Sequence, residues 1–203
     1  MLSLIRRFTL ITVTALLSHT ALADAGNGEF MGYTLGNDYQ AGAATERRMT
    51  ANGNAVIKAE NPVKPANIAK VSVVTTPESL TIGFIDASQW FATEQEARDF
   101  GRKYYEILRA KYYDWEMGQE RLNNNLQVTE LSLVKPPYNL RLQLAEDEDE
   151  TNETGQWRFS MTLSWLSDSK EYRAWNNMAR TQRVAEKEEQ RKQLLEDADL
   201  RGL

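Results

Sequence analysis

The pattern that most constrains the fold is a strict alternation of apolar and polar residues over positions 157–165. Every second position carries a large apolar side chain, namely Trp157, Phe159, Met161, Leu163 and Trp165. Arginine, serine and threonine fill the positions between them. Successive side chains of a strand point to opposite faces, so the segment is expected to be a strand with one buried and one wet face. Such a strand is typical of an antiparallel sheet with a helix on one face.

Further strands are expected on both sides of this segment in the sequence. Residues 70–86 have the pattern of a hairpin that turns at Thr76-Pro77-Glu78-Ser79. Residues 126–134, which end before Pro136-Pro137, and residues 140–144 precede the alternating segment and predict a three-stranded meander with it. The sequence therefore predicts an antiparallel sheet of about five strands.

One amphipathic helix is expected between the hairpin and the meander, from Thr93 to about Tyr113. Thr93 and Glu96 have the spacing of a capping box, in which each side chain satisfies a backbone N–H of the first turn. Apolar residues then recur at helical spacing at Ala97, Phe100, Tyr104, Ile107 and Leu108. We expect this stripe to pack against the sheet.

The fold class expected is α+β, with a long charged helix at the C-terminus. We expect a Gly/Ala-rich N-terminal segment with short strands over residues 24–69, a core domain over residues 70–180 and a charged helical tail over residues 181–203. Ser167-Asp168-Ser169 offers a cap for this last helix, and Trp175 is suited to pack its first turns. Beyond Arg180 the residues are mostly charged, so that part is expected to be solvated.

Residues 1–23 have the three parts of a secretory signal peptide. Arg6 and Arg7 precede a ten-residue apolar run at positions 8–17, and the segment ends in Ala21-Leu22-Ala23. The run is shorter than the roughly 20 residues that a membrane-spanning helix needs. We therefore expect cleavage near Ala23 and a periplasmic or secreted protein. A bacterial periplasm is favoured because the chain has no cysteine, whereas secreted animal proteins usually carry disulfides.

The composition excludes several classes of function for the expected mature protein. Without cysteine there is no thiolate nucleophile or ligand, and the single histidine, His19, lies in the expected signal peptide. Catalysis by Ser-His-Asp or Cys-His groups and zinc sites with histidine ligands are thereby excluded. The chain has 24 basic and 29 acidic residues, which opposes binding to nucleic acid or anionic lipid. We expect a protein that is not an enzyme and holds no cofactor or metal.

An acidic run at residues 146–150 raises the alternative of a calcium loop. Such a loop needs a glycine at its sixth position, where this chain, counted from Asp147, has Asn152. The run is therefore interpreted as a solvated tip between two strands.

Aromatic residues are concentrated in the middle of the chain. Tyr112 and Tyr113 are neighbours on the expected helix and cannot both face the core. Exposed tyrosine and tryptophan favour partner interfaces because they bury much area at low entropic cost. The candidate interface consists of Trp90, Tyr105, Tyr112, Tyr113 and Trp115.

Three functions remain open from the sequence. The leading hypothesis is a non-catalytic protein that binds another envelope or secreted protein, as an inhibitor, an immunity-type factor or an accessory of an envelope complex. The first alternative is a carboxylate-dependent hydrolase of cell-wall glycan that uses two of Asp114, Glu116 and Glu120. The second is a carrier of a small ligand in a pocket between sheet and helix. Nucleic acid and stable membrane insertion after cleavage are not expected.

Overall fold

The structure is a computed structural model of the 203-residue chain. It describes residues 27–42, 45–60, 62–123, 127–146 and 156–200. Residues 197–200 are described by their backbone alone. The expected signal peptide and most of the acidic run, residues 147–150, lie outside the described residues, so the predictions made for them remain predictions.

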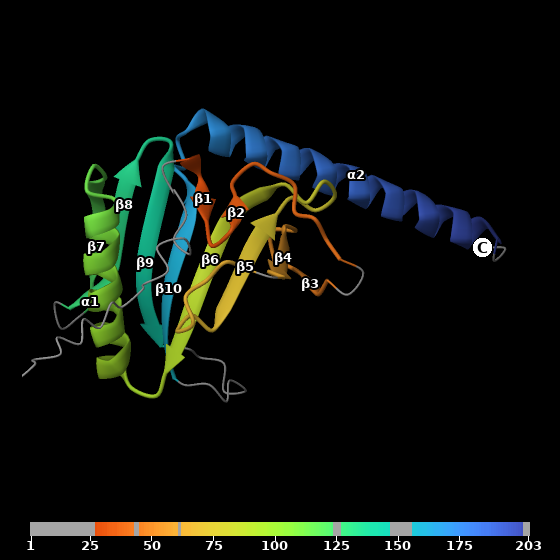
Figure 1. Cartoon of the computed structure of the whole chain (residues 1–203). Helices are drawn as coiled ribbons and strands as arrows, with labels where there is room; N and C mark the ends of the chain where they lie inside the picture. The colour runs from red at the N-terminus through yellow and green to blue at the C-terminus, as the bar shows by residue number, and fades with distance from the viewer. Residues whose placement is uncertain (1–26, 43–44, 61, 124–126, 147–155, 201–203) are drawn as a thin grey trace, which may run out of the picture.

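The protein has an α+β fold built on an eight-stranded antiparallel sheet, with a separate two-stranded hairpin and two helices (Figure 1). The hairpin consists of β1 (Glu29–Phe30) and β2 (Tyr33–Thr34). The large sheet has the order β3-β4-β5-β6-β10-β9-β8-β7. Its strands are β3 (Arg47–Met49), β4 (Ala55–Lys58), β5 (Lys70–Thr75), β6 (Ile82–Phe91), β7 (Glu116–Leu122), β8 (Val128–Lys135), β9 (Tyr138–Glu146) and β10 (Trp157–Trp165).

The large sheet consists of two meanders that meet at its centre. Strands β3 to β6 form the first meander, and helix α1 (Glu94–Lys111) then carries the chain to the far edge of the sheet. Strands β7 to β10 form the second meander, which returns until β10 pairs with β6. In this pairing Met161 lies opposite Ala87 and Leu163 lies opposite Ile85, so the apolar residues of both strands share one face.

The prediction of about five strands is wrong, because the sheet has eight and the hairpin adds two. The five predicted strands are present as β5, β6, β8, β9 and β10. Strand β4 lies in the N-terminal segment for which short strands were expected, and it belongs to the same sheet. The outermost strands β3 and β7 were not predicted, since every residue in them is exposed and neither needs an alternating pattern.

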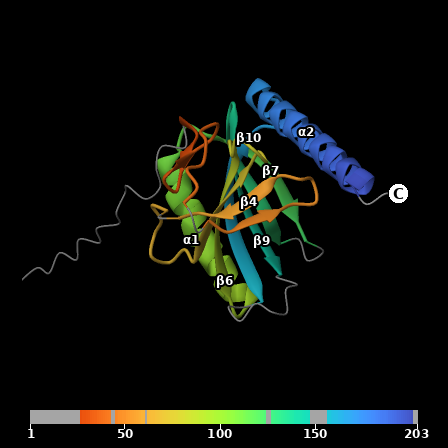
Figure 2. The same ribbon diagram turned by 90° about the vertical axis from the view of Figure 1, so that its right-hand side faces the viewer.

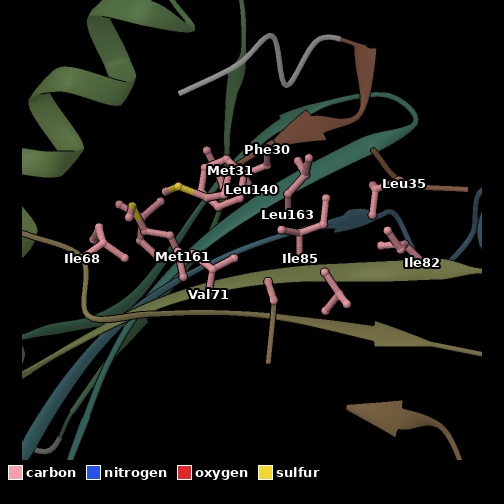
Figure 3. Packing of buried hydrophobic residues seen from close by; sticks show 14 of the residues in the cluster. Phe30, Met31, Leu35, Ile68, Val71, Ile82, Ile85, Leu140, Met161 and Leu163 are labelled. Carbon is pink, nitrogen blue, oxygen red and sulfur yellow. The ribbon is translucent and has the colours of Figure 1, made fainter. Parts of the chain in front are cut away.

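Most of the hydrophobic core lies on one face of the sheet, and a smaller part around Phe84 and Trp175 lies on the other. Helix α1 and the β1–β2 hairpin both cover the first face, as the view along the sheet shows (Figure 2). Phe30 and Met31 of the hairpin region pack towards Leu140, Met161 and Leu163 of the central strands (Figure 3). One face of β10 is thus buried beneath a helix, as the alternation predicts. The prediction of a wet second face is wrong in part, because Ser160 and Ser164 on that face are also buried.

Helix α1 begins as the sequence predicts. Thr93 is its N-cap, and the Thr93 and Glu96 side chains form both hydrogen bonds of a capping box. Ala97, Tyr104 and Leu108 are buried against the sheet, which confirms the predicted apolar stripe. The Tyr104 hydroxyl donates a 2.7 Å hydrogen bond to Asn67 Oδ1, and burial raises the pKa of this tyrosine.

Helix α2 (Lys170–Leu200) is continuous across the predicted boundary at residue 180. The Ser169 hydroxyl caps it by accepting a hydrogen bond from the Tyr172 N–H. Its first turns dock on the sheet through Trp175, and contacts continue to Gln182, which binds the β5–β6 turn, and to Arg183, which binds Asn54. The remaining turns extend away from the sheet (Figure 1). Neither helix in the described part of the chain combines the length and apolar character needed to cross a membrane.

Candidate functional site

A groove opens between α1 and the β7 side of the sheet. Eight strands about 4.8 Å apart make a sheet about 34 Å wide, whereas a helix with its side chains is about 10–12 Å across. Helix α1 packs on β6, β10 and part of β9, and therefore leaves uncovered the apolar surface of β8 and of the adjoining part of β9. The resulting cavity has a volume of about 540 Å³.

The floor of the groove is apolar. Alternation along the strands turns Leu131, Leu142, Leu144 and Phe159 towards α1. Helix α1 lies close to this floor at Gly101, where an added Cβ would lie 3.0 Å from the Phe159 ring. Glycine is unfavourable inside a helix, so its presence here is explained by this close approach.

The wall and mouth of the groove are polar. Tyr105 lies on the wall, and its hydroxyl contacts Met117 Sδ at 3.5 Å. Arg98 is held in place by Glu94 and by a 2.9 Å hydrogen bond to the Val128 carbonyl oxygen. Arg102 also lines the groove, and its side chain is 73% exposed. Its Nη1 atom lies 3.7 Å from Asp99 Oδ1, which is a long distance for an ion pair. The mouth therefore presents a cation with a weak partner.

The five aromatic residues of the candidate interface do not form one surface. Tyr113 is 82% exposed, Tyr105 lines the groove, and Trp90 is half-buried near the end of β6. Tyr112 and Trp115 are only 4% and 3% exposed, which removes them from any interface in this conformation. Their rings pack on each other with centroids 5.1 Å apart, and Arg109 donates to the Trp115 carbonyl oxygen.

The three carboxylates considered for glycan hydrolysis are spread along an exposed edge. Asp114 accepts a 2.5 Å hydrogen bond from Lys135, which lowers its pKa. Glu116 and Glu120 lie in β7, with a register shift between them, and of the three acids only Glu120 lines the groove. The arrangement does not direct two of them at one point in the groove.

Most groove residues were missed from the sequence. Leu131, Leu142 and Phe159 were assigned to strands, but their periodicity is the same whether a helix covers them or not. Arg98 and Arg102 lie outside the predicted apolar stripe of the helix, and no pattern in the sequence gave them a role. Gly101 was the available signal, since a glycine within a strong helical pattern indicates close contact or function.

Comparisons of the chain with protein-family models, with curated proteins and with solved structures find no match. The described residues contain no cluster of three or more histidine, cysteine, aspartate or glutamate side chains suited to a metal ion.

Proposed function

We propose that the protein is a non-catalytic binding protein that takes a small amphipathic ligand into the groove beside α1. The observation that carries this proposal is the apolar groove of about 540 Å³. Binding sites for small molecules typically have volumes of about 300–1,000 Å³, with apolar walls and a few polar groups that fix orientation. The proposal corresponds to the carrier considered from the sequence.

The distribution of polar groups suggests the orientation of the ligand. An apolar chain would lie on Leu131, Leu144 and Phe159, away from water. A carboxylate at its end would lie at the mouth, next to Arg102. Arg98 is already engaged by Glu94 and the Val128 carbonyl, so Arg102 is the better candidate for pairing with the ligand.

The experiment compares decanoate with the uncharged 1-decanol, using isothermal titration calorimetry. The Leu131→Trp variant should bind both at least about tenfold more weakly, because the indole occupies the floor of the groove. The Arg102→Ala variant should weaken decanoate about fivefold and leave 1-decanol unchanged, since only the carboxylate pairs with the guanidinium.

Lys103→Ala is the matched control, because Lys103 is an exposed neighbour on α1 that does not line the groove. It should bind both ligands as the unchanged protein does. Absence of binding to the unchanged protein, or equal binding by Leu131→Trp, would reject the groove as the site.

A second candidate is docking to another envelope or secreted protein through α2. It is supported by exposed apolar side chains on the part of α2 that extends from the sheet, where Leu194 is 70% and Leu195 is 59% exposed. Large exposed apolar side chains on one helix are typical of a helix that docks in a groove of a partner.

Substitution of both leucines by glutamate should abolish retention of a stoichiometric partner on immobilised full-length protein. Lys187→Glu, an exposed change on the same helix, should retain that partner. Equal retention by the Leu194→Glu, Leu195→Glu variant would exclude this part of α2 as the docking element.

A further inference from the structure

Strand β7 leaves a long edge of the sheet open. Among the described residues it pairs only with β8, so the backbone N–H and C=O groups along its outer side have no strand partner. All seven of its residues are exposed. Proteins commonly protect such an edge with lysine, proline, a very short strand or a bulge, and of these β7 has only a bulge. The opposite edge strand, β3, has only three residues.

The bulge makes the order of side chains along β7 symmetrical. Met117 and Glu120 pair with leucines of β8 on the α1 face, and both line the groove. Glu116 and Arg121 pair with residues of β8 that alternate with these leucines, so their side chains lie on the opposite face. One extra residue between Met117 and Glu120 shifts the alternation by one position. The strand therefore presents its faces in the same order when it is read in either direction.

This symmetry fits an antiparallel pairing of β7 with β7 of a second copy of the chain. With a twofold axis at the centre of residues 116–121, Glu116 of each copy lies opposite Arg121 of the other. Met117 likewise lies opposite Glu120. Directly opposite residues of an antiparallel pair share a face, and this register satisfies the rule for both pairs. A shift by one residue in either direction would place residues of opposite faces against each other.

The same register makes the strand complementary to itself in charge. A twofold interface repeats every contact, so Glu116 and Arg121 would form two pairs of opposite charge. Glu116 forms no ion pair within the part of the chain that the structure describes. Arg121 is 68% exposed and lies 3.8 Å from the Glu130 carboxylate, which is a long distance for an ion pair. Both side chains are therefore accessible to a second copy.

We propose that two copies of the chain associate through β7 into one continuous antiparallel sheet. Main-chain hydrogen bonds across the edge supply affinity, and the paired charges fix the register. A strand of another protein would need a matching order of faces and charges, which β7 already has for itself.

The pairing also places the second copy beside the groove. The twofold axis stands perpendicular to the sheet, so both α1 helices lie on the same side of it. Glu120 of the second copy then lies next to Met117, at the border of the groove that α1 does not cover. The association does not depend on the ligand proposed for the groove.

Sedimentation velocity at low salt, over a range of protein concentrations, tests the pairing. The unchanged protein should show an equilibrium between monomer and dimer that depends on concentration. The Glu116→Arg variant should dimerise at least about tenfold more weakly, because it places arginine opposite Arg121 at two positions. Glu188→Arg is the matched control, since it makes the same change in charge at an exposed position of α2. It should dimerise as the unchanged protein does.

A mixture of two variants separates strand pairing from other forms of association. Glu116→Arg and Arg121→Glu should each be mainly monomeric alone. Mixed in equal amounts, they should dimerise within about threefold of the unchanged affinity, because both cross-strand pairs again join opposite charges. Unchanged far-ultraviolet circular dichroism would show that each variant is folded. Glu116→Arg decides the test by itself if Arg121→Glu does not fold.

Three results would each overturn the proposal. The first is an unchanged protein that stays monomeric at every concentration. The second is a Glu116→Arg variant that dimerises as the unchanged protein does, which would place the contact elsewhere, as on the exposed leucines of α2. The third is a mixture of the two folded variants that remains monomeric.

Discussion

Substitution of Trp175 by alanine is expected to lower the free energy of unfolding by about 3–5 kcal/mol, as is typical when a buried aromatic side chain is removed. Trp175 is 3% exposed and packs edge-on against Phe84, with ring centroids 5.4 Å apart. Its indole Nε1 donates a 2.9 Å hydrogen bond to the Thr81 carbonyl oxygen. Trp175 is therefore the large side chain by which α2 is buried against the sheet, next to the small Ala179.

The opposite partner in this contact is Gly83, which gives the prediction a second variant. A Cβ at residue 83 would lie 2.2 Å from Cε2 and 2.3 Å from Cζ2 of Trp175. Gly83→Ala is therefore expected to destabilise the protein by about 1–3 kcal/mol through overpacking. In the Gly83→Ala, Trp175→Ala double variant this clash is gone, so the two losses should not add.

Urea denaturation followed by far-ultraviolet circular dichroism measures these changes. Leu194→Ala is the control, because this exposed position on the same helix should change stability by less than about 0.5 kcal/mol. Two results would contradict the packing of α2 on the sheet through Trp175. One is a double variant whose loss of stability equals the sum of the two single losses, and the other is a Trp175→Ala protein as stable as the control.

The Phe159→Ala variant is expected to lose a similar amount, about 3–5 kcal/mol, and to gain a larger groove. Phe159 is buried beneath α1 and contacts Phe100 edge-on, with centroids 5.6 Å apart, and Tyr104 at 6.3 Å. Because Phe159 also lines the groove, its removal should leave a cavity that is continuous with it. An apolar ligand that enters this cavity stabilises the folded state by mass action.

Thermal unfolding with and without 1-decanol tests this second prediction. The ligand should raise the melting temperature of Phe159→Ala more than that of the unchanged protein. Leu122→Ala, a change at an exposed position of β7, should alter neither stability nor the response to ligand. If the ligand does not stabilise Phe159→Ala, the space left by the ring does not communicate with the groove.

The parts of the fold that were predictable from the sequence are those with a strong local signal. Helix α1 has a capping box and an apolar stripe, and β10 has an uninterrupted alternation. The edge strand β7 has neither, since its sequence EMGQERL is exposed throughout and its position depends on pairing with β8. Tertiary pairing of this kind leaves no mark in a local pattern.

The groove could not be predicted for the same reason. It depends on the width of the sheet relative to one helix, and three of the strands that set this width, β3, β4 and β7, are short or exposed. The aromatic residues show a related limit. Helix α1 ends at Lys111, before the expected Tyr113, so Tyr112 and Tyr113 lie just beyond it. Only the three-dimensional packing shows that Tyr112 and Trp115 are both inside while Tyr113 is exposed.

The pairing of β6 with β10 has a consequence for the order in which the molecule can form. These two strands lie at the centre of the sheet, yet their paired residues are more than sixty positions apart in the sequence. A ribosome therefore completes the first meander long before its partner exists, and β6 has an open edge throughout that interval. Closure of such distant segments slows folding and leaves hydrogen-bonding edges exposed to other chains. The last strand to be synthesised is the one that protects both halves from aggregation.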